Sequence, residues 1–220
     1  MKKLATKLII AAVVLSVTTI RGGQAQEAIS KMRSSWDAVQ CYTVRMHINQ
    51  VKDSRTKDYT VDFSYNSSGW IKTHIIDGDN KGSVVVYDPV NHRIRVRWAG
   101  VALPVNLSPD SKMTQGLRGE KIYEGSFGAM LKDADWYLSH GSLSWIGEEP
   151  FEGADCAVIE FVTTLPDENR GIARERWWLD KSTSLPRKIE GYESDGKEVE
   201  RVIYRNLKLN PDLPEDHFKL

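Results

Sequence analysis

Alternation of apolar and polar residues with a period of two constrains this chain most strongly, because it predicts strands that bury one face. The alternation is clearest at residues 42–49 and 59–66, on either side of a polar turn. Turn sequences then precede three further expected strands, one after residues 66–69, one at residues 83–87 and one at residues 92–98. Because every connection is short, the first half of the chain predicts an antiparallel meander.

The last third of the chain predicts three more antiparallel strands. Two apolar runs flank the turn Ser194–Lys197, whose Asp-Gly pair is the strongest short-range hairpin signal, and a third run, Arg174–Asp180, precedes them. Two other strands are expected upstream, at residues 142–148 and 154–164. The strand at 154–164 is apolar on both faces, so we expect it to be central in the sheet and covered on both sides.

Two helices are expected beside these strands. Residues 26–40 carry apolar side chains at helical spacing, and residues 121–139 predict an inserted helix in which Gly125 and Gly128 each cost about 1 kcal/mol relative to Ala. The connection at residues 99–119 is rich in Gly and Pro, and loops of this length in a compact domain are commonly lids or mobile segments. The expected fold class is therefore α+β and mostly β, with about ten antiparallel strands.

The N-terminal residues have the pattern of a cleavable signal peptide. Three lysines precede the apolar run Leu8–Ile20, and Gly23-Gln24-Ala25 supplies the small residues of a cleavage site. A retained membrane anchor needs about 18 or more apolar residues, and this run is shorter. We therefore expect a signal peptide at residues 1–25, a single domain at residues 26–220, no membrane span after cleavage, and a periplasmic or secreted protein.

Charge does not select a partner for this chain. Acidic and basic residues number 30 each, which gives no electrostatic case for nucleic acid or for an anionic membrane surface. A local row at Arg93, Arg95 and Arg97 is open to two interpretations, an anion site or a solvated outer face. We favour the solvated face, paired with acidic residues of neighbouring strands. The acidic positions expected to supply these partners are Glu160, Glu175, Glu190 and Glu200.

The two cysteines leave a second alternative open. In an oxidising compartment a disulfide between Cys41 and Cys156 would stabilise the fold by roughly 4 to 5 kcal/mol on the chain-entropy model. Each is equally well read as a small buried apolar residue. Spacing alone does not decide between a possible disulfide and two free thiols.

Motifs for catalysis, metal binding or cofactor binding are not found. The five histidines are scattered singly, without HxH, HExxH or CxxC arrangements. Ser126 lacks the Gly-x-Ser-x-Gly spacing of a nucleophile elbow, and the glycines near it are not followed by the Gly-Lys-Ser/Thr of a phosphate-binding loop. We therefore expect no enzyme activity, no metal and no cofactor.

Tryptophan is abundant, with seven residues in the chain. Such side chains suit the wall of a cavity for acyl chains, because they combine a large apolar area with one polar N–H group. Ordinary core packing explains them equally well. A third reading makes them stacking platforms for sugars, which requires them on an exposed polar face.

Several C-terminal motifs point to one resemblance. They are Glu175–Asp180, Leu185–Lys188, Tyr192–Gly196, Tyr204–Asn210 and Leu213–Phe218, together with the strand opening Cys41-Tyr42-Thr43 after a first helix. These motifs resemble those of LolA-like outer-membrane lipoprotein-sorting proteins, and most closely an uncharacterised domain-of-unknown-function branch of that superfamily. The resemblance implies a strongly curved antiparallel sheet, wrapped as an incomplete barrel around the N-terminal helix and the inserted helix, with an apolar cavity beneath them.

The resemblance also suggests functions. In the carriers the cavity takes the acyl chains of a lipoprotein, whereas related domains act as envelope-stress sensors. Our leading hypothesis is a non-enzymatic periplasmic protein that holds a lipid or a lipidated polypeptide, and a lipoprotein carrier is the more specific form of this hypothesis. The alternatives are a sensor or scaffold that contacts another envelope protein, and a polysaccharide-binding module. The expected cavity lining is Tyr42, Val44, Met46, Val61, Phe63, Tyr65, Val96, Trp98, Phe127, Met130 and Leu131.

Overall fold

The computed structural model describes residues 22–220. Most of the expected signal peptide lies outside the described residues, so cleavage after Ala25 stays a prediction. Ala25 itself is fully buried in the first turns of the N-terminal helix, which is helical from residue 22 to residue 37. No helix within residues 22–220 has the length and apolar character needed to cross a membrane.

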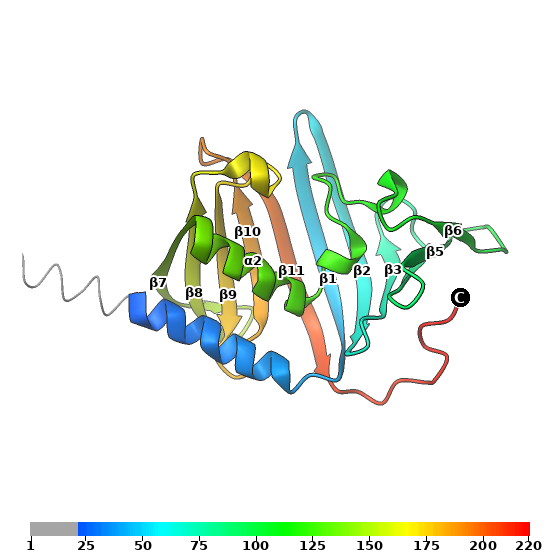
Figure 1. Cartoon of the computed structure of the whole chain (residues 1–220), viewed down its shortest axis with the longest axis horizontal. Helices are drawn as coiled ribbons and strands as arrows, with labels where there is room; N and C mark the ends of the chain where they lie inside the picture. The colour runs from blue at the N-terminus through cyan, green and yellow to red at the C-terminus, as the bar shows by residue number, and fades with distance from the viewer. Residues whose placement is uncertain (1–21) are drawn as a thin grey trace, which may run out of the picture.

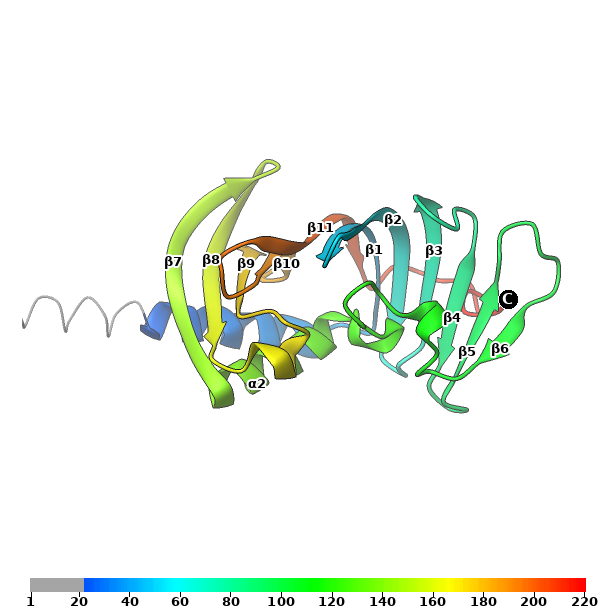
Figure 2. The ribbon, with the colours of Figure 1, turned by 90° about the horizontal axis from the view of Figure 1, so that it is seen from above.

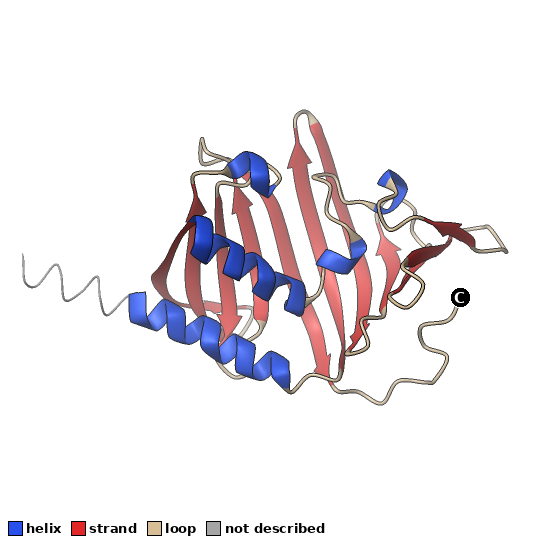
Figure 3. Ribbon diagram, in the orientation of Figure 1, coloured by secondary structure: helices blue, strands red, loops and turns tan. Residues whose placement is uncertain are grey.

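Eleven antiparallel strands form one open sheet (Figures 1 and 3). In chain order the strands are β1 (Cys41–Lys52), β2 (Arg55–Asn66), β3 (Ile71–Asp77), β4 (Val84–Asp88), β5 (Arg93–Arg97), β6 (Val105–Leu107), β7 (Gly141–Phe151), β8 (Ala154–Thr163), β9 (Arg174–Asp180), β10 (Pro186–Tyr192) and β11 (Glu198–Leu209). Their order across the sheet is β6-β5-β4-β3-β2-β1-β11-β10-β9-β8-β7. The mostly-β α+β class is confirmed. The additional strand is the short β6, inside the Gly- and Pro-rich connection.

The strand β8 is not central, as its composition had suggested, but second from the edge formed by β7. It is nevertheless covered on both faces. Phe161 lies in the main core, whereas Cys156 and Val158 form a separate cluster with Trp178 on the other side of the sheet. Trp178 is itself covered by Lys188, whose ammonium nitrogen lies 3.4 Å from the ring centroid. Side chains of β9 and β10 therefore cover the outer face of β8, which explains why that face is apolar.

The inserted helix α2 (Phe127–His140) begins later than its periodicity indicated. A short 3₁₀ helix, η2 (Ile122–Glu124), and Gly125 precede it, and the Ser126 side chain caps α2 by accepting from the Ala129 N–H at 3.2 Å. Gly128 permits close contact with the N-terminal helix, because a Cβ atom there would lie 2.7 Å from the Trp36 ring. The close contact between α2 and the N-terminal helix therefore requires glycine at position 128, although this glycine weakens α2.

Both helices cross the concave face of the same half of the sheet, over β7 to β11 (Figures 1 and 2). They bury the main core there, where the Tyr42 and Phe127 rings stack at 4.8 Å between centroids and the Tyr42 hydroxyl accepts from the Phe127 N–H at 3.3 Å. The concave face of the other half carries a smaller cluster, formed by Val85, Ile94 and Val96. The connection between β6 and α2 covers that cluster in part, since Ile122 packs against it.

This connection, expected to be a lid or a mobile segment, is anchored at Arg118. Arg118 is 5% exposed, and its guanidinium donates to the backbone oxygens of Val51 and Arg170 and to the carboxylate of Glu193. It therefore links the connection to the end of β1, to the segment before β9 and to the turn after β10. A further 3₁₀ helix, η1 (Lys112–Thr114), lies earlier in the connection.

The expected pairing of the arginine row is wrong. β5 lies between β4 and β6, whereas the four acidic residues proposed as partners lie on β8 to β11, in the other half of the sheet. Arg93 pairs instead with Asp88 of the adjacent strand, at 3.3 Å. Residue patterns within each strand do not reveal that β1 and β11 join the two halves, so they do not give the order of strands across the sheet.

The two cysteines are free. Three strands separate β1, which carries Cys41, from β8, which carries Cys156. With strands roughly 4.8 Å apart, this spacing is well beyond the reach of a disulfide. The possible disulfide is therefore not formed in this structure.

Candidate ligand-binding cavity

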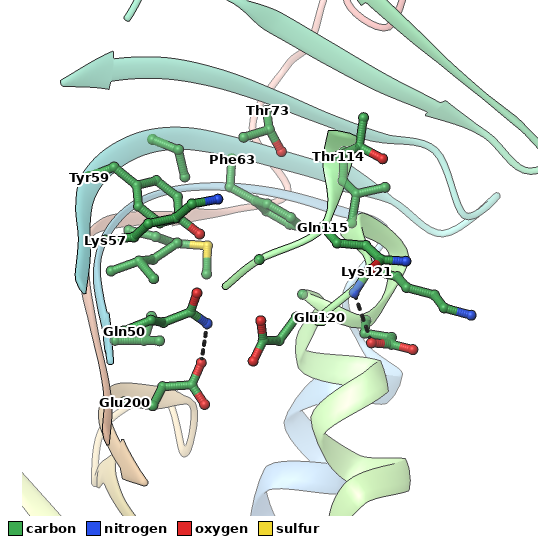
Figure 4. A pocket seen from close by; sticks show the side chains of 18 of the residues that line it. Gln50, Lys57, Tyr59, Phe63, Thr73, Thr114, Gln115, Glu120, Lys121 and Glu200 are labelled. Atoms are coloured by element: carbon green, nitrogen blue, oxygen red, sulfur yellow. Dashed lines mark hydrogen bonds between the residues drawn. The ribbon is translucent and has the colours of Figure 1, made fainter. Parts of the chain in front are cut away.

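A cavity of about 300 Å³ lies where the cover of the concave face changes from α2 to the connection before it. Its floor is formed by β1, β2, β3, β9, β10 and β11, and residues 113–125 form much of its opposite wall. Figure 4 shows this arrangement, with Glu120 and Gln115 facing Phe63, Gln50 and Glu200 of the sheet. This volume is at the lower end of the range for ligand pockets.

Two rows of side chains cross the cavity floor from strand to strand. The register of the sheet aligns opposite residues, and opposite residues share one face. The polar row is Glu175, Gly191, Glu200, Gln50 and Lys57, on β9, β10, β11, β1 and β2 in turn. The apolar row, two residues further along each strand, is Trp177, Ile189, Val202, Ile48 and Tyr59. The floor therefore changes from polar to apolar across the cavity.

Hydrogen bonds fix the polar row. Gln50 Nε2 donates to Glu200 Oε1 at 2.7 Å, and Trp177 Nε1 donates to Glu175 Oε2 at 2.9 Å. At Gly191, an added Cβ would lie 3.2 Å from Ile172 and 3.3 Å from the Cβ of Glu200, so the glycine lets these neighbours approach. The row is thus built by specific contacts.

Three further charged residues face the polar row from outside the sheet. Glu120 belongs to the connection, Asp133 to α2, and Arg170 to the segment between the 3₁₀ helix η3 (Pro166–Asn169) and β9. The charged end of the cavity therefore holds four carboxylates, the guanidinium of Arg170 and, at the β2 end of the polar row, the ammonium group of Lys57. Although burial opposes its charge, the surrounding carboxylates, led by Glu200 and Glu175, raise the pKa of Arg170 above its ordinary value.

Burial shifts two of the carboxyl groups into the neutral pH range. Loss of solvation raises the pKa of Glu200 to about 7, with a further contribution from the charge of Glu120. Burial likewise raises the pKa of Asp133 to about 7, and the charge of Glu175 adds to it. These groups therefore exchange protons near neutral pH.

Comparison with known proteins begins with the C-terminal half of the chain. A family profile described as sporulation protein YdcC-like matches residues 137–218, which is less than half of the chain. An uncharacterized protein of Methanocaldococcus jannaschii is 29% identical over 105 residues. That match covers 47% of this chain and 28% of the relative, so the chain spans less than a third of the length of the relative.

Solved structures share the fold across most of the chain. An uncharacterized conserved protein from Thermus thermophilus matches at TM-score 0.57 and 10% identity, covering 90% of this chain and 93% of its own. Lipoprotein LppX of Mycobacterium tuberculosis matches at TM-score 0.54 and 12% identity, covering 86% and 98%. The Pseudomonas aeruginosa MucA/MucB complex matches at TM-score 0.52 and 15% identity, covering 90% and 61%.

These matches, the open curved sheet and the helices on its concave face agree with the resemblance found in the sequence. The chain has the LolA-like fold. In this LolA-like chain the cavity lies at the centre of the concave face, partly beneath α2 and partly beneath the connection that precedes it.

The structure distributes the eleven expected lining residues between the cavity and the core. Those on the cavity wall are Met46, Val61, Phe63, Trp98 and Met130. Those away from it are Tyr42, Val44, Tyr65, Val96, Phe127 and Leu131. Tyr42 and Phe127 stack on each other in the core of the LolA-like fold, and Val96 belongs to the smaller cluster. Side-chain parity predicts that these residues lie on the concave face, but it does not distinguish residues that pack in the core from residues that line the cavity.

The polar row was missed, although the sequence contains a signal for it. Glu200 has the same parity along its strand as Val202 and Tyr204, and Gln50 has the same parity as Ile48. Polar residues in the otherwise apolar half of an alternating pattern are placed on the buried face. The expectation that Glu175 and Glu200 pair with the arginine row would place them on a solvated face instead. Parity along each strand, applied strictly, predicts that both Glu175 and Glu200 lie on the concave face.

Proposed function

We propose that this chain is a non-enzymatic binding protein that holds a lipid or a lipidated polypeptide in the cavity. The observation that carries the proposal is the apolar row, which presents hydrocarbon and aromatic surface to a space of about 300 Å³. The LolA-like fold supports the proposal, because the resemblance associates this architecture with the acyl chains of lipoproteins. A cavity of this size suits one short acyl chain.

Burial of hydrocarbon supplies the binding energy. Each methylene group taken from water contributes about 0.8 kcal/mol, which corresponds to roughly a fourfold gain in affinity. Since this force has no direction, the cavity accepts chains of different lengths until it is full. Affinity for a series of linear alcohols should therefore rise with chain length and then reach a plateau.

Tryptophan fluorescence provides the readout for the test, because Trp98 and Trp177 line the cavity. Linear alcohols of increasing length should change the emission with a stepwise gain in affinity. Val202→Phe, which fills the cavity from the apolar row, should weaken binding. Ile203→Phe is the matched control, because the adjacent residue points to the other face of β11. Absence of binding for every chain length would refute the proposal.

Export forms part of the proposal. The predicted signal peptide would place the mature chain in the periplasm or outside the cell, where lipidated polypeptides are sorted. Cell fractionation and intact-mass measurement test this point, with a mature N-terminus at Gln26 as the expected result. Retention in the cytoplasm would contradict it.

A sensor or scaffold role is the second candidate function. Two observations favour it. β6 forms an open edge of the sheet beside Leu103, which is 77% exposed, and a matching fold occurs in the MucA/MucB complex. Crosslinking from Leu103 in cells would then trap a protein partner, independently of Val202. Polysaccharide binding has less support, because each of the seven tryptophans is at least partly buried.

A further inference from the structure

The cavity has a charged end and an apolar end. On its floor, the polar row and the apolar row are two residues apart along each strand, which is roughly 7 Å. A ligand that fills the cavity therefore meets hydrocarbon over part of its length and charged groups over the rest. This arrangement suits an amphiphile, with a polar head and an apolar body.

Carboxylates are in excess at the charged end. Glu175 and Glu200 come from the sheet, Glu120 from the connection and Asp133 from α2, and the charge of Arg170 acts on all four. Arg170 and Lys57, the cationic side chain at the β2 end of the polar row, do not balance four carboxylates. Burial is the main cause of the raised pKa values of Glu200 and Asp133, and the like charges of Glu120 on Glu200 and of Glu175 on Asp133 raise them further.

One buried carboxylate oxygen lacks a partner. Glu120 Oε2 accepts from the Arg118 N–H at 3.3 Å, whereas Glu120 Oε1 is buried and has no hydrogen-bond donor within residues 22–220. Burying such an oxygen without a donor costs free energy. Figure 4 shows the Glu120 carboxylate directed into the cavity toward Gln50 and Glu200. A ligand that carries N–H donors and positive charge satisfies this oxygen and balances the charge.

We propose that the ligand is an amphiphile with an ammonium head, which sits between Glu120, Glu175 and Glu200 while its hydrocarbon body lies along the apolar row. Ammonium hydrogen bonds to carboxylates are charge-assisted and therefore strong. An anionic head would instead face four carboxylates. Within residues 22–220 no three His, Cys, Asp or Glu side chains are arranged to hold a metal ion, which favours an organic cation. The inference rests on the proposed function, because it names the ligand class for the same cavity.

Three probes with the same hydrocarbon chain separate head from body: dodecylammonium, dodecanol and dodecanoate, each below its micelle-forming concentration at pH 7. Tryptophan fluorescence should show dodecylammonium binding at least tenfold more tightly than dodecanol, and dodecanoate binding most weakly. If dodecanol or dodecanoate binds as tightly as dodecylammonium, the ammonium proposal is wrong while the binding function stands. If none of the three binds, the proposed function fails as well.

Charge-neutral variants then locate the head. Glu200→Gln and Glu175→Gln should each reduce the ratio of dodecylammonium affinity to dodecanol affinity by at least threefold. Glu198→Gln is the matched control on the same strand, because the Glu198 carboxylate pairs with Arg201 instead. A preference that survives both cavity variants would overturn the assignment. Circular dichroism checks folding, and the three-probe comparison in the unmodified protein decides the question if a variant unfolds.

Discussion

Gln50 and Glu200 are joined by a 2.7 Å hydrogen bond between β1 and β11, the strands that unite the two halves of the sheet. The same Gln50 side chain accepts from the Leu117 backbone N–H at 2.9 Å through its Oε1 atom. One amide therefore connects the sheet, the acidic end of the cavity and the connection above it.

Replacement of Gln50 tests this role. Gln50→Ala removes the donor of Glu200 and leaves the buried Leu117 N–H without an acceptor, so it should lower the free energy of unfolding by about 1–3 kcal/mol. Urea denaturation measures the change. Asn49→Ala is the control, because the neighbouring Asn49 bonds Asp58 at an exposed site and its loss should cost well under 1 kcal/mol. Equal effects of the two changes would contradict the prediction.

The half-buried carboxyl groups of Glu200 and Asp133 predict an unusual pH dependence of stability. Glu200 and Asp133 have pKa values of about 7 in the folded chain, above their unfolded values, so the folded state holds more protons between pH 4.5 and 7. Stability from these groups is complete below this range and falls as pH rises through it, by about 1.4 kcal/mol per pH unit for each group. Glu120, Glu175 and Arg170 are the charged groups that act on Glu200.

Comparison with a variant isolates this contribution. His217 has a lowered pKa and contributes the opposite slope in part of the same range, so the useful quantity is the difference between proteins. Glu200→Gln cannot ionise, so its stability relative to the unmodified chain should rise by about 1–3 kcal/mol between pH 5 and pH 8. Urea titrations at several pH values measure it. A constant difference would show that Glu200 does not titrate in this range.

The contact between Gly128 and Trp36 predicts that the effect of Gly128→Ala on stability changes sign when the Trp36 ring is removed. Gly128→Ala should destabilise the protein, because its Cβ would meet the Trp36 ring at 2.7 Å, even though alanine favours a helix by about 1 kcal/mol over glycine. In a Trp36→Ala background the same change should stabilise by about that amount. Thermal denaturation of the four proteins in this cycle decides the matter. A stabilising Gly128→Ala in both backgrounds would exclude the close contact.

The anchor at Arg118 predicts local opening. Arg118→Met leaves the backbone oxygens of Val51 and Arg170 without this donor, so it should cost about 2–3 kcal/mol and increase hydrogen exchange across residues 108–121. Lys112→Met is the control, since Lys112 is an exposed residue of the same connection. Unchanged exchange in Arg118→Met would show that other contacts hold this segment.

Much of the fold could be predicted from local signals. Alternation and turn residues specify ten of the eleven strands, because each hairpin is closed by a few neighbouring residues. β6 escaped detection because it has three residues and lies among glycines and prolines. The position of β8 in the sheet was predicted wrongly for a different reason. Trp178 and Lys188 bury the outer face of β8, so this strand has the apolar composition that is typical of a central strand.

The cavity was less predictable than the sheet. Parity distinguishes the two faces of a strand, but the extent of α2 and of the connection decides which concave residues are covered. Phe127 and Met130 lie one turn apart on α2, yet Met130 lines the cavity and Phe127 packs against Tyr42. The acidic end is assembled from four separate segments of the chain. Only the three-dimensional arrangement brings those segments together.

Pairing of β1 with β11 has a consequence for the order of folding. Gln50 and Glu200 are 150 residues apart in the sequence, so their contact closes a long loop of chain. The hairpins of each half form from local contacts. The seam between the halves, which is the pairing of β1 with β11, forms only when β11 is present. Pairing between segments so distant in sequence is slow. Because the cavity floor spans the seam, the floor is incomplete until β11 has paired with β1. Capture of the proposed ligand would therefore require the C-terminal strand.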